Sequence, residues 1–167
     1  KSPGGFVHKT ARVCKLVIIG RDSVVHEKCY IGENTYIGES VIIKKETRIS
    51  NDVVIRSFST IGERTTIHPN VEIGISCRIG NRTLIDTDTI IHSSSIIQND
   101  VTLGIECVIA DSSVVGVSLL SNSVTAERSI VDRYNTLSGI FDGRKWVYYR
   151  GPNNKRRLAV GCQNHSL

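Results

Sequence analysis

Methionine is absent from the 167-residue sequence, including position 1. We therefore expect the chain to be processed or to be a fragment of a longer protein. The sequence also lacks any run of about 18 consecutive apolar residues, which argues against a membrane-spanning helix. Its first residues contain no apolar h-region, so no signal peptide is expected. These absences predict a cytoplasmic protein without a membrane partner.

Aromatic residues make up only 5% of the chain, although 40% of it is hydrophobic. The core must then consist mainly of Ile and Val, whose branched side chains favour β-strands. The five cysteines follow neither a CxxC nor another zinc-binding spacing, so reduced thiols and no metal are expected. The length fits a single domain.

Positive charge is concentrated near the C-terminus. The net charge is +5, yet no acidic residue follows Asp142. The basic residues beyond it are Arg144, Lys145, Arg150, Lys155, Arg156 and Arg157. Because the preceding body is nearly neutral, we expect no nucleic-acid partner.

A six-residue repeat dominates the sequence. Every sixth residue from Val7 to Val115 is aliphatic, without an insertion. Four residues after each aliphatic lies a smaller residue, most often Ser, Thr, Cys or Val. Residues two apart in a strand point to the same side, so the small residue and the next aliphatic should both point inward. Glycine often follows the aliphatic, as at Gly20 and Gly38, and we interpret it as a turn residue with unusual dihedral angles.

A period of six excludes an α-helix, whose period is 3.6 residues. Three such faces would close a triangular prism of 18 residues per coil, with coils stacked about 4.8 Å apart. The pattern resembles that of the hexapeptide-repeat family. The resemblance implies an all-β fold, a left-handed parallel β-helix of about six to seven coils over residues 7–120. Residues 1–6 would form an N-terminal extension, and residues 121–167 an irregular last coil and a basic aromatic cap.

The residues just before the aliphatics should point outward in three columns. Two of these columns are more apolar than a monomer should leave in water. The more apolar columns read Ile18, Tyr36, Val54, Glu72, Ile90 and Val108, and Val24, Ile42, Thr60, Arg78, Ile96 and Val114. Members of the resembled family commonly pack around a three-fold axis, so the likeness implies a homotrimer.

The repeat weakens after Val115, because Ser121 and Glu127 occupy positions that should be aliphatic. A Phe-Asp-Gly-Arg sequence ending at Arg144 then precedes an apolar strand over residues 145–150. This segment resembles the C-terminal part of sugar-1-phosphate nucleotidylyltransferases that carry an acetyltransferase β-helix. No phosphate-cradling glycine-rich loop occurs.

Acyltransferases of the resembled family use a His as general base, two residues after a core aliphatic. No His occupies that position here. The best candidate for a catalytic base is His92, one residue earlier, with Asp86 and Asp88 one face away. His68, followed by Pro69, is interpreted as a structural corner.

Four basic residues are candidates for binding a coenzyme A or sugar phosphate: Arg144, Lys145, Arg156 and Arg157. Alternatively, this segment only caps the open end of the prism. Two functions therefore stay open. One is acyl transfer from acetyl-CoA to a sugar or nucleotide sugar. The other is a non-catalytic trimerising or effector-binding β-helix of a sugar nucleotidylyltransferase.

Overall fold

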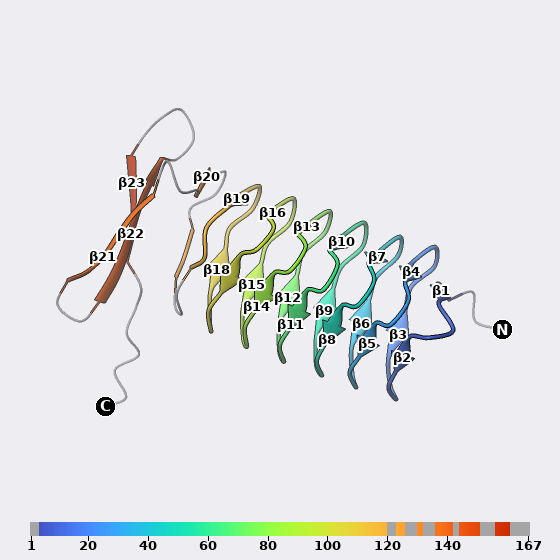
Figure 1. The fold of residues 1–167 in the computed structure, drawn as a ribbon. Helices are drawn as coiled ribbons and strands as arrows, with labels where there is room; N and C mark the ends of the chain where they lie inside the picture. Colours follow the sequence, from blue (N-terminus) through green and yellow to red (C-terminus); the bar gives the residue numbers. More distant parts are fainter. Residues whose placement is uncertain are drawn as a thin grey trace.

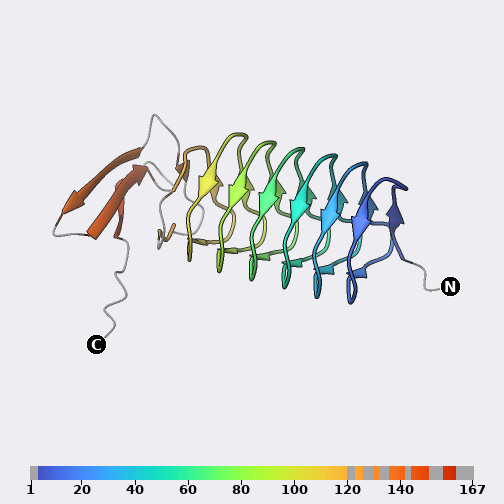
Figure 2. The ribbon, with the colours of Figure 1, turned by 60° about the horizontal axis from the view of Figure 1, so that its bottom comes forward.

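The computed structural model of the chain is a parallel β-helix followed by antiparallel strands (Figures 1 and 2). It describes residues 4–119, 123–125, 130–131, 136–141, 144–150 and 156–160. Short strands recur every six residues and stack into three parallel sheets, here called faces A, B and C. Every described regular element is a strand, which confirms the predicted all-β class and is consistent with a left-handed β-helix.

Each face collects every third strand of the repeat. Face A contains β1 (Phe6–Val7), β4 (Val24–Val25), β7 (Ile42–Ile43), β10 (Thr60–Ile61), β13 (Arg78–Ile79), β16 (Ile96–Ile97) and β19 (Val114–Val115). Face B contains β2 (Arg12–Val13), β5 (Tyr30–Ile31), β8 (Arg48–Ile49), β11 (Thr66–Ile67), β14 (Leu84–Ile85) and β17 (Thr102–Leu103). Face C contains β3 (Ile18–Ile19), β6 (Tyr36–Ile37), β9 (Val54–Ile55), β12 (Glu72–Ile73), β15 (Ile90–Ile91) and β18 (Val108–Ile109).

The second residue of each strand forms the core. The register places Ile61 opposite Ile79 and Ile67 opposite Ile85, so identical side chains stack from coil to coil. From Val25 to Val115 these residues are at most 1% exposed. The first residue of each strand points outward, and Ile96 is 37% exposed. The inward and outward columns predicted from the sequence are therefore confirmed.

The turns differ from the sequence prediction. A positive φ occurs two residues beyond the glycine position, at non-glycine residues such as Asp22 and Asn34. These side chains tolerate the left-handed region better than most. Gly20 itself has no positive φ, but a Cβ there would lie 2.5 Å from the carbonyl carbon of Gly38. Close approach of stacked coils, rather than unusual dihedral angles, requires glycine at that position.

The small inward residues tie neighbouring coils together. The Ser59 hydroxyl donates to the Gly74 carbonyl at 2.8 Å and accepts from the Cys77 amide at 3.0 Å. Thr47 and Thr65 donate to carbonyls of the next coil in the same way. Hydrogen bonding removes the cost of burying these hydroxyls. The inward column of small residues is therefore polar, but its buried hydroxyls have hydrogen-bond partners.

The coil that ends at β20 (Ile130–Val131) is two residues shorter than the coils before it. Ile130 pairs with Val114, sixteen positions earlier, whereas the coils before it repeat at eighteen. Leu119 and Val131 occupy the inward positions and are 3% and 1% exposed. Val117 packs against the core between Val115 and Leu119, so extended chain replaces a turn. Ser121 and Glu127, where the sequence loses its register, lie outside the described residues.

Face A continues beyond the prism into antiparallel strands. β20 (Ile130–Val131) pairs with β22 (Arg144–Arg150), which lies between β21 (Thr136–Phe141) and β23 (Arg156–Val160). The strand predicted over residues 145–150 is confirmed and begins one residue earlier, at Arg144. No helix among the described residues has the length and apolar character needed to cross a bilayer.

Candidate functional site

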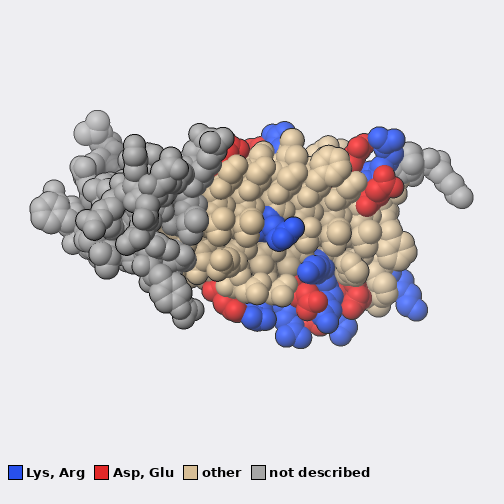
Figure 3. Space-filling model, turned by 90° about the horizontal axis from the view of Figure 1, so that it is seen from above, with Lys and Arg blue, Asp and Glu red and all other residues tan. Residues whose placement is uncertain are grey.

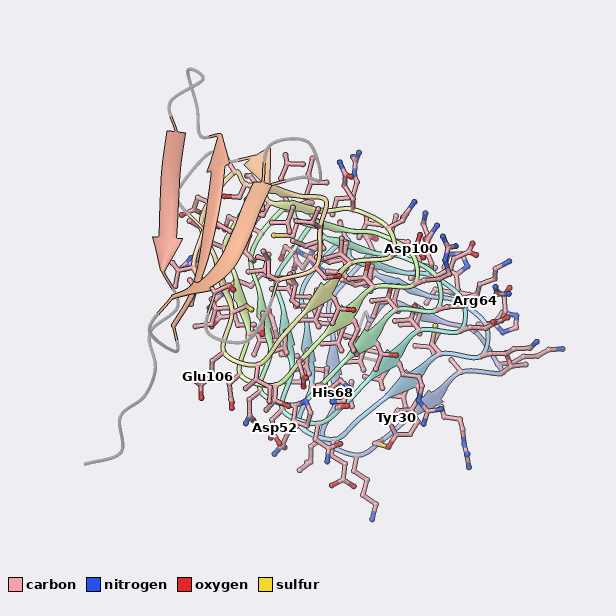
Figure 4. The ribbon with its side chains drawn as sticks, turned by 60° about the vertical axis from the view of Figure 1, so that its left-hand side comes forward. Tyr30, Asp52, Arg64, His68, Asp100 and Glu106 are labelled. Carbon is pink, nitrogen blue, oxygen red and sulfur yellow. The ribbon has the colours of Figure 1, made fainter. Side chains whose placement is uncertain are left out.

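The turns between strands form three edges, which differ in charge. We call them the A–B, B–C and C–A edges after the faces they join. Between residues 32 and 106, no Lys or Arg lies in the turns of the B–C edge. Its acidic residues are Glu33, Asp52, Asp86, Asp88 and Glu106. Figure 4 shows Asp52, His68 and Glu106 along one edge and Arg64 and Asp100 along another. An anionic ligand is therefore disfavoured at the B–C edge.

His92, the base candidate from the sequence, lies on the C–A edge directly after β15. The residue is exposed, and its ring makes no hydrogen bond or ion pair with any described residue. Its backbone is held in place, because the His92 carbonyl accepts the Cys77 thiol at 3.1 Å. Burial raises the pKa of Cys77, so this thiol remains a protonated donor. The imidazole is thus solvent-accessible on a fixed backbone.

The carboxylates expected near His92 have other partners. Asp86 Oδ1 lies 3.8 Å from His68 Nδ1, on the B–C edge. The same oxygen accepts the Thr87 amide at 2.8 Å, so Asp86 also stabilises its own turn. Asp88 accepts from the Asn70 side chain at 3.0 Å. Neither aspartate orients His92, and His68 sits in the acidic part of the surface.

Ion pairs neutralise Lys45, Arg64 and Arg82 of the A–B edge. Arg82 donates two hydrogen bonds to Asp100, at 2.6 and 2.7 Å, and these lower the pKa of the Asp100 carboxyl. Arg64 pairs with Glu46 at 2.8 Å and lowers the pKa of that carboxyl in the same way. Within the part of the chain that the structure describes, no group of three or more His, Cys, Asp or Glu could hold a metal ion.

Face A carries a hollow that the sequence did not reveal. Its volume is about 300 Å³, at the lower end for small-molecule pockets. The lining residues are Arg78, Gly80, Ile96, Ile97, Gln98 and Asn99. The surface seen in Figure 3 is broad and mostly uncharged, with one basic side chain near its middle and the other charged side chains gathered along its margins. His92 and this hollow border the same face, on consecutive parts of one coil.

The four predicted phosphate-binding residues fall into two pairs at opposite ends of β22. Arg144 and Lys145 begin β22, whereas Arg156 and Arg157 of β23 pair with Arg150 and Tyr149 at its other end. Three residues of β22 separate these pairs, so Lys145 and Tyr149 lie about 14 Å apart along the extended chain. The backbone therefore does not bring the four cations to one point.

The sequence matches neither a protein-family model nor a curated protein. Solved structures do match the fold. A Bacillus cereus protein of inferred acetyltransferase activity aligns with 95% of this chain and 83% of its own, at 14% identity and a TM-score of 0.69. This chain has the hexapeptide-repeat β-helix fold.

Two further structures with this β-helix contain coenzyme A compounds. The acetyltransferase domain of PglB from Neisseria gonorrhoeae, in complex with acetyl coenzyme A, has 23% identity and a TM-score of 0.62. The alignment covers 71% of this chain but only 53% of that chain. A variant of AntD, an N-acyltransferase from Bacillus cereus bound to dTDP and coenzyme A, has 15% identity and a TM-score of 0.54, with 76% of each chain aligned. At these sequence identities, the likeness between this chain and the solved structures shows a shared fold alone.

Proposed function

We propose that this chain is an acyl-CoA-dependent acyltransferase, acting on an amine or hydroxyl of a sugar or nucleotide sugar. The observation that carries the proposal is the arrangement of face A, which has an accessible imidazole at one margin and a cationic hollow toward the other. The chain from His92 to Gln98 is six residue steps long and therefore spans at most about 20 Å. An extended acyl-CoA can bridge that distance. The fold shared with proteins that bind coenzyme A supports the same reading.

His92 acts as the general base in this proposal. A neutral imidazole takes the proton from the acceptor amine or hydroxyl while that group attacks the thioester carbonyl. The new C–N or C–O bond forms, the C–S bond breaks, and the proton passes to the departing thiolate. The products are the acylated acceptor and free coenzyme A. A metal takes no part in this scheme.

Assembly as a homotrimer is part of the proposal. Outward apolar residues on faces A and C are exposed in the single chain, including Tyr36 at 43% and Ile90 at 37%. Apolar strips of this kind favour contact with another subunit. A neighbour would also exclude water from face A, where the thioester would react. Light scattering during gel filtration measures the assembly, and a monomer at micromolar concentration would contradict it.

Transfer from acetyl-CoA to a panel of amino sugars and nucleotide amino sugars tests the function. We expect thiol release with at least one acceptor, and acetyl-CoA should raise the melting temperature. His92→Ala should lower kcat by about 10²–10⁴-fold, whereas His68→Ala should leave it unchanged. A loss of kcat in His68→Ala without a loss in His92→Ala would overturn the role of His92. Equal melting temperatures of the two variants would show that the fold is retained.

A non-catalytic scaffold is the second candidate. It is favoured by the uninterrupted prism, because no loop leaves the repeat between residues 7 and 115 to cover a substrate. This candidate predicts no transfer with any acceptor and no thermal shift with acetyl-CoA, coenzyme A or nucleotide sugars. Thiol release at a rate above the protein-free background would exclude it.

A further inference from the structure

We infer that the hollow at Arg78 binds the phosphates of the acyl donor. The inference rests on the proposed function and names a subsite for it. Arg78 is exposed on face A, and its guanidinium group makes no hydrogen bond or ion pair with the residues that the structure describes. The other outward residues of face A, from Val24 to Val114, are uncharged. Arg78 is thus an uncompensated cation in an otherwise uncharged strip.

The arginines of the adjoining A–B edge already have carboxylate partners. Arg82 is held by Asp100 and Arg64 by Glu46, both on the A–B edge. An arginine already paired with a carboxylate attracts an anion far less than one without a partner. A phosphate approaching this part of face A therefore meets its strongest donor at Arg78.

The rest of the hollow suits a phosphate with an apolar arm. Asn99 accepts the Asn81 amide through its side-chain oxygen at 2.7 Å, which leaves its NH₂ group as a donor. Gly80 has no side chain, and a Cβ there would lie 2.5 Å from the Asn99 nitrogen. Glycine here lets the two coils pack closely along one side of the hollow. Ile96, 37% exposed, supplies an apolar wall. Guanidinium and amide donors beside an apolar wall fit a phosphate and the chain attached to it.

The position of the hollow also fits the reaction. Phosphates held at Arg78 and Gln98 leave the acyl end free to extend along face A towards His92. Between residues 32 and 106 the acidic B–C edge offers no Lys or Arg, so a donor bound there would be repelled. Donor and base therefore meet on face A.

Two acyl donors separate this subsite from the rest of the site. Acetyl-CoA contains phosphates, and the acetyl thioester of N-acetylcysteamine does not. Arg78→Gln should raise KM for acetyl-CoA by about tenfold and leave kcat/KM for the phosphate-free thioester unchanged. Arg12→Gln is the matched control, because Arg12 is an exposed outward residue on face B whose guanidinium group makes no hydrogen bond or ion pair with a described residue. It should change neither donor's kinetics.

A binding measurement makes the result independent of turnover. Titration calorimetry with 3′,5′-ADP, the phosphate-bearing end of coenzyme A, should show binding to the native chain and its loss in Arg78→Gln. Unchanged binding of 3′,5′-ADP in Arg78→Gln would overturn the subsite. An equal loss of rate with both acyl donors in this variant, or dissociation of its assembly, would overturn it too. If 3′,5′-ADP binds through Arg78 but no acceptor is acylated, the proposed function fails and the phosphate site stands.

Discussion

The interior and the exterior of the prism both consist of stacked ladders, but the two kinds of ladder have different consequences for stability. Inside, Ile67 stacks on Ile85 and Ser59 bonds to the next coil, with both side chains fully buried. Outside, Arg82 and Asp100 stack at the same spacing, with side chains 54% and 59% exposed. The same repeat therefore yields essential contacts on one side of the sheet and replaceable ones on the other.

Replacement of an inward aliphatic should have the largest effect. Ile67→Asp places an unpaired charge where the side chain is 0% exposed, at a cost of several kcal/mol. We expect loss of the cooperative thermal transition, measured by circular dichroism. Thr66→Asp, at the outward neighbour, should keep that transition. A native-like melting curve for Ile67→Asp would show that the inward register is wrong.

Removal of one interior hydroxyl should have an intermediate effect. Ser59→Ala leaves the Gly74 carbonyl and the Cys77 amide without the partner they have at 2.8 and 3.0 Å. The free energy of unfolding should fall by about 1–3 kcal/mol in urea titrations. Ser50→Ala is the control, because its hydroxyl makes no hydrogen bond in the described structure. Equal losses in the two variants would contradict a special role for the inward column.

Disruption of a surface ion pair should have the smallest effect. Arg82→Gln should leave the melting temperature at pH 7 unchanged within measurement error, because solvent screens this exposed pair. The pKa of Asp100 lies below its ordinary value of 3.8 through hydrogen bonds from Arg82. Any stabilisation it gives is present above pH 3.8 and is lost as the pH falls through the lowered pKa. A clear loss of stability at pH 7 would show that the outer ladders matter as much as the inner ones.

The prism could be predicted well from the sequence, because each repeat must bury its aliphatic residue in the core. Aliphatic residues at a strict spacing of six leave no other way to form a core. The glycine positions were misinterpreted, since sequence alone does not separate a positive φ from close packing against the next coil. At Gly20 the cause is close packing, and the positive φ belongs to Asp22.

The site was less predictable, because it depends on which side chains already have partners. Asp86 appeared available to His92 in the sequence, but the register brings it to His68. Arg78 looked like one polar residue in an apolar column. Its importance emerges only from the pairing of Arg82 and Arg64 and from the hollow beside it. Such facts depend on neighbours eighteen residues away, which a local motif does not include.

The shortened last coil bears on how such a repeat can change length. From Val115 through Val117 to Leu119, inward residues are two apart, as strand geometry requires. Deleting two residues therefore keeps every later inward position inside, as Val131 demonstrates. Deleting one would turn the following Ile and Val residues towards water. Insertions and deletions of even length at an edge are thus the tolerated ones, and the parity of a gap in an alignment indicates whether the core survives it.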